Sequence, residues 1–304
     1  MNVGLRTHVD AEADFLSLDA FISRWSPRLH TAMQAEVTAL QLGFPPLDDA
    51  LARLLGVEGG PGRRWRPLLT LASAEALGAE GQDALPVAVA VELTHAASLA
   101  LDDLPCMDDA VARRGQPATH RLVGSAGAIL LSVGLLARAA ELLADSDRDA
   151  AALCGTWARA FGLHGMSGGQ AVDVAGKPGT GPRRRLFRCK STSLAAFAVR
   201  GGAVRAGAQA DTCDALERFG TALGWAYQLA DDATDLAQDA AAGHPPGGRN
   251  PQRQSRYLMQ RAARQLARSA VLDTDGARLL TQLGWAVLAG GATFTTTTRQ
   301  ERTA

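Results

Sequence analysis

The sequence predicts an all-α protein of roughly ten or more helices that form one domain over residues 1–304. Apolar residues recur at three- and four-residue spacing along most of the chain, which is the period of amphipathic or buried helices. The apolar content is mostly Ala and Leu, which favours close helix packing, and only a weak FTTTT near the end suggests a strand. Hydrophobic residues make up 47% of the chain, which is ample for a sizeable core.

The expected helices follow one another from about Leu18 onward, and segments rich in Gly and Pro separate them. The helical segments are 21–42, 47–56, 67–78, 85–104, 126–145, 151–165, 194–208, 213–239 and 255–272. Segments 85–101 and 126–136 are nearly apolar all round, so we expect both in the interior of the bundle. Residues 1–15 are expected as a polar N-terminal tail and residues 292–304 as a disordered C-terminal tail.

Composition and charge argue against several classes of protein. The chain has 31 basic and 31 acidic residues, whereas nucleic-acid-binding proteins usually carry a basic excess. Its four cysteines lack CxxC spacing, which is typical of reduced intracellular thiols and not of a zinc site. The N-terminal residues do not resemble a signal peptide, and no uninterrupted apolar window of about 18 residues predicts a membrane span. We therefore expect a cytoplasmic protein with no nucleic-acid partner and no membrane span.

Four aspartates fall within eight positions of the stretch SLALDDLPCMDDAVARRG. Asp102 and Asp103 end a long apolar helix pattern, and Pro105 should break the helix because it lacks an N–H and disfavours helical geometry in the residue before it. The irregular turn then lets Asp108 come back towards Asp102. Carboxylates this close raise one another's pKa, so either water or a bound cation must screen them.

A second acidic cluster, AYQLADDATDLAQD, contains Asp231, Asp232 and Asp235, of which the first and last share a helix face. Oxygen-rich clusters without a nearby histidine pair favour a hard ion such as Mg²⁺ over zinc. Because Mg²⁺ usually takes one or two carboxylates, two facing clusters suit a diphosphate bridged by several ions. Either cluster alone is also typical of a solvated acidic face, but two of them, each at the end of an apolar helix, favour the metal site.

Several motifs occur in a fixed order along residues 53–239. They are GRRWRP (Gly62–Pro67), ExxH (Glu92 and His95), DDxxxxD followed by RRG (Asp102, Asp103, Asp108, Arg113, Arg114 and Gly115), GGQ with Asp173 (Gly168, Gly169 and Gln170), KST (Lys190–Thr192) and YQxxDDxxD (Tyr227, Gln228, Asp231, Asp232 and Asp235). In this combination the chain resembles the trans-polyprenyl diphosphate synthases, the farnesyl and geranylgeranyl diphosphate synthase family. The DDLPCMDDA variant is especially similar to bacterial geranylgeranyl diphosphate synthases of carotenoid pathways.

The resemblance implies a class I isoprenoid synthase bundle around a central cavity, working as a homodimer. Such an enzyme ionises an allylic diphosphate and joins the cation to isopentenyl diphosphate. The implied cofactor is Mg²⁺, with three ions per active site when substrate is bound. The implied metal ligands are Asp102, Asp108 and Asp231, with Asp235; Asp103 and Asp232 support them as further catalytic residues.

The resemblance also implies which residues bind the two substrates. The allylic diphosphate would contact Arg113, Lys190 and Gln228, and isopentenyl diphosphate would contact Arg63, Arg66, His95 and Arg114, with Ser191 and Gln170 as further substrate-binding residues; Lys190 also counts as catalytic. Without the resemblance, the arginines of GRRWRP could be surface charges, His95 a core histidine and Lys190 part of a solvated basic run. The glycines before GRRWRP favour a phosphate-binding loop.

Ala97 and Ser98 lie one turn before Asp102, where an apolar tunnel for the growing chain should pass. In the family, a bulky aromatic residue at either position stops elongation at farnesyl. Two small residues therefore imply geranylgeranyl diphosphate as the product, with farnesyl or another short-chain diphosphate as the alternative. The sequence does not locate the floor of the tunnel.

Three departures from the family pattern bear on function. Leu101 stands where a histidine is frequent, Arg63 replaces a lysine, and the lysines expected after the second acidic motif are missing, with Arg249 the nearest candidate. One alternative is a class I terpene cyclase, against which the intact isopentenyl-binding set argues. Another is a non-catalytic partner subunit, which the missing lysine leaves open.

Overall fold

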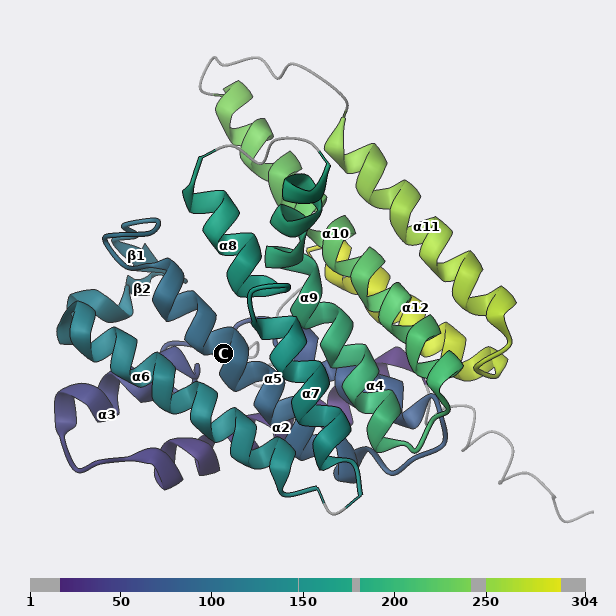
Figure 1. The fold of residues 1–304 in the computed structure, drawn as a ribbon, viewed down its shortest axis with the longest axis horizontal. Coiled ribbons are helices and arrows are strands. Elements are labelled where there is room, and N and C mark those ends of the chain that lie inside the picture. Colours follow the sequence, from purple (N-terminus) through teal and green to yellow (C-terminus); the bar gives the residue numbers. More distant parts are fainter. Residues whose placement is uncertain (1–16, 147, 177–180, 242–249, 291–304) are drawn as a thin grey trace, which may run out of the picture.

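Helices form almost all the regular structure in the described part of the chain (Figure 1). The computed structural model describes residues 17–146, 148–176, 181–241 and 250–290, without the side chains of 183 and 235–241. Both expected tails and Arg249 lie outside these residues. The all-α class that the sequence predicts is confirmed.

The helices span most of the predicted segments. In chain order they are α2 (Leu18–Leu40), α3 (Pro45–Leu54), α4 (Trp65–Glu75), α5 (Gly81–Asp102), α6 (Thr119–Ala144), α7 (Ala150–Phe161), α8 (Met166–Val174), α9 (Pro182–Arg205), α10 (Ala210–Ala241), α11 (Pro251–Ser269) and α12 (Thr274–Leu288). Between α5 and α6, two short strands, β1 (Ala112–Arg113) and β2 (Gln116–Pro117), pair antiparallel.

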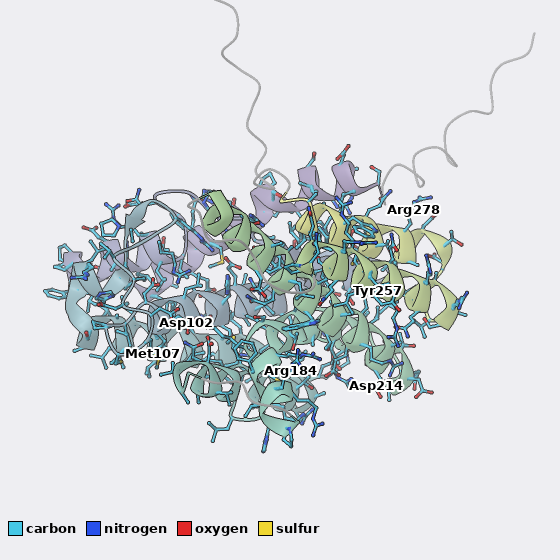
Figure 2. The ribbon with its side chains drawn as sticks, turned by 90° about the horizontal axis from the view of Figure 1, so that it is seen from above. Asp102, Met107, Arg184, Asp214, Tyr257 and Arg278 are labelled. Atoms are coloured by element: carbon cyan, nitrogen blue, oxygen red, sulfur yellow. The ribbon has the colours of Figure 1, made fainter. Side chains whose placement is uncertain are left out.

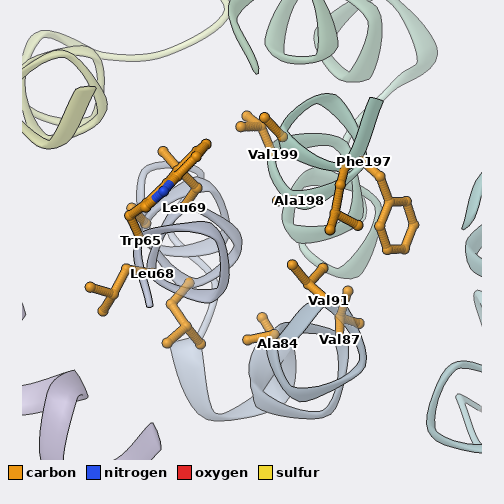
Figure 3. Close-up of a cluster of buried hydrophobic side chains, with 14 of the residues drawn as sticks. Trp65, Leu68, Leu69, Ala84, Val87, Val91, Phe197, Ala198 and Val199 are labelled. Carbon is orange, nitrogen blue, oxygen red and sulfur yellow. The ribbon is translucent and has the colours of Figure 1, made fainter. Parts of the chain in front are cut away.

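The core centres on α4, α5 and α9, which pack against one another (Figure 3). Its buried side chains include Trp65, Leu68 and Leu69 from α4, Val87 and Val91 from α5, and Phe197, Ala198 and Val199 from α9. Most of α5 is buried, which confirms that residues 85–101 lie in the interior. Because this core fixes α5, it also fixes Asp102 at the end of that helix.

Helix α10 lies close against α9 because it carries glycines at the contact. A Cβ atom on Gly220 would lie 2.6 Å from the Ala195 carbonyl oxygen, and one on Gly224 would lie 2.9 Å from the Ser191 carbonyl oxygen. Any side chain at either position would force the helices apart, since packed interiors have little room to yield. The close approach brings the second acidic motif next to the KST segment of α9.

Helix α6 corrects one expectation from the sequence. Residues 126–136 were expected inside the bundle, but Ile129, Leu130 and Val133 are exposed. Helices α5 and α6 are both long and apolar enough to cross a membrane, although 67% of the most apolar window of α5 is buried in the protein against 22% for α6. Periodicity alone does not separate a core helix from one with a large exposed apolar face, and such a face marks a contact surface.

Candidate active site

The first acidic motif lies in an irregular turn at the C-terminal end of α5. The helix ends at Asp102, and the N–H of Asp108 donates to the Asp102 carbonyl oxygen at 2.9 Å. The N–H of Met107 donates to the Leu104 carbonyl oxygen at 2.8 Å, and Pro105 lies inside this turn. The turn therefore brings Asp108 back beside Asp102, as the sequence predicts; Figure 2 shows Asp102 and Met107 close together.

The RRG segment forms the tight turn between β1 and β2. Arg114 and Gly115 both have positive φ, 52° and 75°, as the central residues of a type I′ hairpin turn require. The preceding Arg113 points at Asp103: its Nε donates to both carboxylate oxygens at 2.9 Å, and its Nη2 donates to Oδ1 at 2.6 Å. Asp103 is 1% exposed. The structure thus pairs two residues for which the sequence predicts separate roles.

Asp102 and Asp108 are the remaining carboxylates of the first motif, and neither has a hydrogen bond or salt bridge from its side chain to any other described residue. Burial raises the pKa of Asp102 to about 6; Lys190 and Arg113 oppose this effect, whereas Asp108 and Asp103 add to it. A half-buried carboxylate such as Asp102, next to another carboxylate, gains stability from a bound cation.

The second acidic motif lies on α10 and is tied to α9. Ser191 Oγ donates to Gln228 Oε1 at 2.6 Å, and Gln228 Nε2 donates to Asp232 Oδ1 at 2.8 Å. The Tyr227 hydroxyl hydrogen-bonds to Asp231; burial, followed by this carboxylate, raises the pKa of Tyr227. These contacts order four of the predicted site residues, Ser191, Gln228, Asp231 and Asp232, while the side chain of Asp235 lies outside the described part.

Lys190 links α9 to α8. Its Nζ donates to Asp173 Oδ2 at 2.5 Å, and its charge also lowers the pKa of Asp102. The two helices meet at Gly169, where a Cβ atom would lie 2.3 Å from the Lys190 backbone nitrogen. The GGQ segment therefore allows the lysine to approach the first acidic motif.

A cavity of about 390 Å³ is lined by the arginines of GRRWRP and by Arg114. Its lining comprises residues 59–66, Glu92, His95, Arg114 and Tyr227. Gly62 has φ +65°, and a Cβ there would lie 2.6 Å from the Arg114 guanidinium. Arg66 Nη1 lies 3.1 Å from His95 Nε2. Guanidinium groups gathered in one cavity suit bidentate binding of a phosphate group.

The charge in this cavity is only partly compensated within the described residues. Burial, followed by Arg66 and Arg114, lowers the pKa of His95 well below its ordinary value, so His95 is neutral and accepts from Arg66. Glu92 is 5% exposed; burial raises its pKa, nearby Arg64 opposes this, and its Oε2 has no hydrogen-bond partner. One buried carboxylate among several guanidiniums leaves an excess of positive charge, which favours an anion.

Arg64 has a structural role that its sequence motif does not reveal. It has φ 43° and is buried, and its Nη2 donates to the Leu55 and Gly56 carbonyl oxygens at 2.9 and 3.3 Å. These bonds hold the loop that precedes α4. The Cζ atoms of the flanking Arg63 and Arg66 lie 5.9 and 6.0 Å from the centroid of the Tyr227 ring.

A separate, mainly apolar cavity of about 380 Å³ begins at Asp102. It is lined by Ser98, Leu101, Asp102, Met107, Phe161, Met166, Ser167, Gln170, Ala171 and Val174. Both amide atoms of Gln170 are buried without a hydrogen-bond partner. Ala97 is fully buried in the core and does not line this cavity, so only Ser98 of the predicted chain-length pair faces it.

The donor groups of both acidic motifs fit a hard divalent cation, since they are carboxylates and an amide. Among the described residues, no three acidic, His or Cys side chains lie close enough together to hold an ion by themselves. Asp231 lines another cavity, of about 810 Å³, which the arginine cavity adjoins through Arg63 and Tyr227. Mg²⁺ completes its shell with water and substrate phosphates, so the donors fit ions bound together with a diphosphate.

The site contains three residues beyond those that the sequence predicts. They are Glu92, which balances the arginines, Phe161, which walls the apolar cavity, and Tyr227, which contacts both arginine side chains and Asp231. Glu92 and Tyr227 lie inside the ExxH and YQxxDDxxD motifs. Phe161 belongs to no motif, and only its place in the wall of the cavity beside Ser98 reveals it.

Comparisons with known proteins agree with this geometry. Residues 49–248 match the polyprenyl synthetase family. The chain is 34% identical over 252 residues to a farnesyl diphosphate synthase of Geobacillus stearothermophilus, covering 80% of this chain and 84% of the relative. It is 38% identical over 222 residues to a geranylgeranyl diphosphate synthase of Pantoea ananas, covering 64% and 72%.

Solved structures give the same result. An FPP/GFPP synthase from Zymomonas mobilis superposes with a TM-score of 0.75 at 27% identity and covers 89% of this chain and 98% of that one. The fold is that of the isoprenoid synthases, and the chain is a prenyltransferase. It belongs to the polyprenyl synthetase family, which confirms the resemblance noted from its motifs.

Proposed function

We propose that this enzyme condenses isopentenyl diphosphate with dimethylallyl, geranyl and farnesyl diphosphates and releases geranylgeranyl diphosphate. The observation that carries the proposal is the pair of cavities around α5. One is lined by arginines, and the other is apolar and begins at a carboxylate. The arginine cavity suits a substrate that is held by its diphosphate. The apolar cavity suits a substrate whose hydrocarbon tail must be kept out of water.

In the proposed reaction, Arg63, Arg66 and Arg114 bind the diphosphate of isopentenyl diphosphate, and neutral His95 orients Arg66. Lys190 and Gln228 bind the allylic diphosphate. Lys190 is positioned by Asp173 and Gln228 by Ser191 and Asp232. Asp103 holds Arg113 beside the first motif.

Asp102, Asp108, Asp231 and Asp235 would hold Mg²⁺, three ions in the full complex. When bound, Mg²⁺ neutralises the charge that develops on the leaving diphosphate. The carbon–oxygen bond of the allylic substrate breaks, and Lys190 and Arg113 stabilise the departing anion. The isopentenyl double bond attacks the cation, and the released diphosphate takes the proton, so no nucleophilic side chain is needed.

The length of the product is the finer part of the proposal. Ser98 supports geranylgeranyl diphosphate because its small side chain does not close the apolar cavity from the α5 side. Farnesyl diphosphate is the second candidate, since the bulky Phe161 of α7 lines the same cavity.

We also propose that two copies pair through α6. Ile129, Leu130 and Val133 form an exposed apolar face on this helix. In a cytoplasmic homodimer, a second copy of the chain would cover this face. Leu130→Glu should convert the dimer to monomers in sedimentation velocity, and an unchanged sedimentation coefficient would count against this interface.

A radiolabel assay tests the activity. The enzyme is supplied with labelled isopentenyl diphosphate, Mg²⁺ and each allylic donor in turn, and the dephosphorylated products are separated by chromatography. We expect labelled geranylgeraniol from all three donors. Cyclised products without incorporated label would indicate a terpene cyclase, and no turnover with any donor would indicate a non-catalytic subunit.

A further inference from the structure

The apolar cavity below Asp102 has an aromatic wall that comes from α7. Phe161, the last residue of α7, lines the cavity together with Ser98 of α5. On α5 itself no aromatic residue approaches this level, since Ala97 and Ser98 are both small. The bulk that narrows the cavity is therefore supplied by a helix about sixty residues further along the chain.

A hydrogen bond sets the level of α7 relative to α5. Trp157 Nε1 donates to Thr94 Oγ1 at 2.9 Å. Phe161 follows Trp157 by four residues, and Ser98 follows Thr94 by four residues, so each pair spans about one helical turn. Phe161 and Ser98 both line the apolar cavity, so the bond fixes the position of the Phe161 ring relative to α5.

Trp157 packs against the Phe161 ring and supports it. The rings of Trp157 and Phe161 stack with centroids 6.0 Å apart and an interplanar angle of 8°. Thr94 is fully buried, and its hydroxyl donates to the Ala90 carbonyl oxygen at 2.7 Å while it accepts from Trp157. The Thr94 hydroxyl thus both donates and accepts a hydrogen bond, and a shift of Trp157 would leave a buried polar group unpaired.

We propose that Phe161 is the stop that ends chain elongation, and that Trp157 and Thr94 are positioning residues that hold it in place. The inference rests on the proposed prenyl-elongating function and adds the residue that determines its product length. A growing tail that enters the cavity from Asp102 meets the Phe161 ring, and further additions of isopentenyl diphosphate then require the ring to move.

Substitutions at these three positions test the stop. In Phe161→Ala, total isopentenyl incorporation should be retained. The amount of products longer than the wild-type product, measured relative to the wild-type product itself, should rise about tenfold or more. Thr94→Val should broaden the product distribution towards longer chains, and Thr94→Ser should restore the wild-type distribution because it keeps the hydroxyl. Trp157→Phe should behave like Thr94→Val. Leu163→Ala, an exposed position just after α7, is the matched control and should change nothing.

An unchanged product distribution in Phe161→Ala, with incorporation retained, would overturn the proposal. Equal broadening in Thr94→Val and Thr94→Ser would remove the positioning role of the hydroxyl. A wild-type enzyme that makes no prenyl product from any donor would overturn the proposed function instead.

A binding series tests the same stop without catalysis. Bisphosphonates with one, two, three and four prenyl units are titrated with Mg²⁺ into the wild type and into Phe161→Leu, a milder change that preserves the fold. In the wild type, affinity should stop rising at one tail length; in the variant, the next longer ligand should bind about tenfold more tightly or better. The same limiting tail length in both proteins would refute the stop even if neither turns over.

Discussion

The first acidic motif contains two aspartates that should respond to the same substitution in different ways. The Asp103 side chain is 2% exposed and forms an ion pair with Arg113, whose side chain is 35% exposed. Asp108 is exposed and has no hydrogen bond or salt bridge from its side chain to another described residue. Replacing either carboxylate by an amide keeps its shape and removes its charge.

The size of the difference follows from burial. Breaking a fully buried ion pair costs about 3–5 kcal/mol, but the partly exposed Arg113 keeps some hydration and Asn retains one hydrogen bond. We therefore expect Asp103→Asn to lower the free energy of unfolding by about 2 kcal/mol. Asp108→Asn should change it by no more than about 0.5 kcal/mol, as for an ordinary surface substitution.

Urea unfolding followed by circular dichroism, without Mg²⁺ or substrate, measures both values. Activity should fall in both variants, because one displaces Arg113 and the other removes a proposed metal ligand. Equal stability of the two variants would refute the assignment of Asp103 to Arg113, and full activity of Asp108→Asn would refute its role at the metal.

Three further outcomes follow from the site. Gly62→Ala places a methyl group against the Arg114 guanidinium, so KM for isopentenyl diphosphate should rise several-fold while KM for the allylic donor changes little; equal rises would contradict this division. Burial lowers the pKa of His95 below 6.5, so the unfolded chain takes up a proton that the folded protein does not, and stability should fall as pH drops below about 6.5. In His95→Gln, the melting temperature should depend less on pH between about pH 6.5 and 5. An unaltered pH dependence of the melting temperature would count against a neutral His95. Ser98→Phe should shorten the product, whereas Ala97→Phe should mainly destabilise the core by about 1–3 kcal/mol, and chromatography with melting experiments separates the two.

Much of the fold and of the local site geometry could be predicted from sequence because it depends on neighbouring residues. Helical periodicity predicts the buried α5, and Pro105 predicts the turn that returns Asp108 to Asp102. The Asp103–Arg113 pair could not be predicted in this way. The register of the β1–β2 hairpin decides which arginine of the RRG segment faces the carboxylate and which faces Gly62.

Features that depend on distant parts of the chain were missed for a similar reason. The apolar pattern of α6 is the same for a core helix and for one with an exposed apolar face, so Leu130 was wrongly expected to be buried. Phe161 is remote in sequence from Ser98, and the two line one cavity in a structure where Trp157 of α7 donates to Thr94 of α5.

The dependence of ligand binding on magnesium tests the central claim most directly. Isothermal titration with a geranyl bisphosphonate, with and without Mg²⁺, compares the wild type with Asp102→Asn. We expect strong binding heat for the wild type only when Mg²⁺ is present, and little heat for the variant in either case. Equal binding with and without the metal, or an unaffected variant, would contradict a diphosphate site formed by these carboxylates.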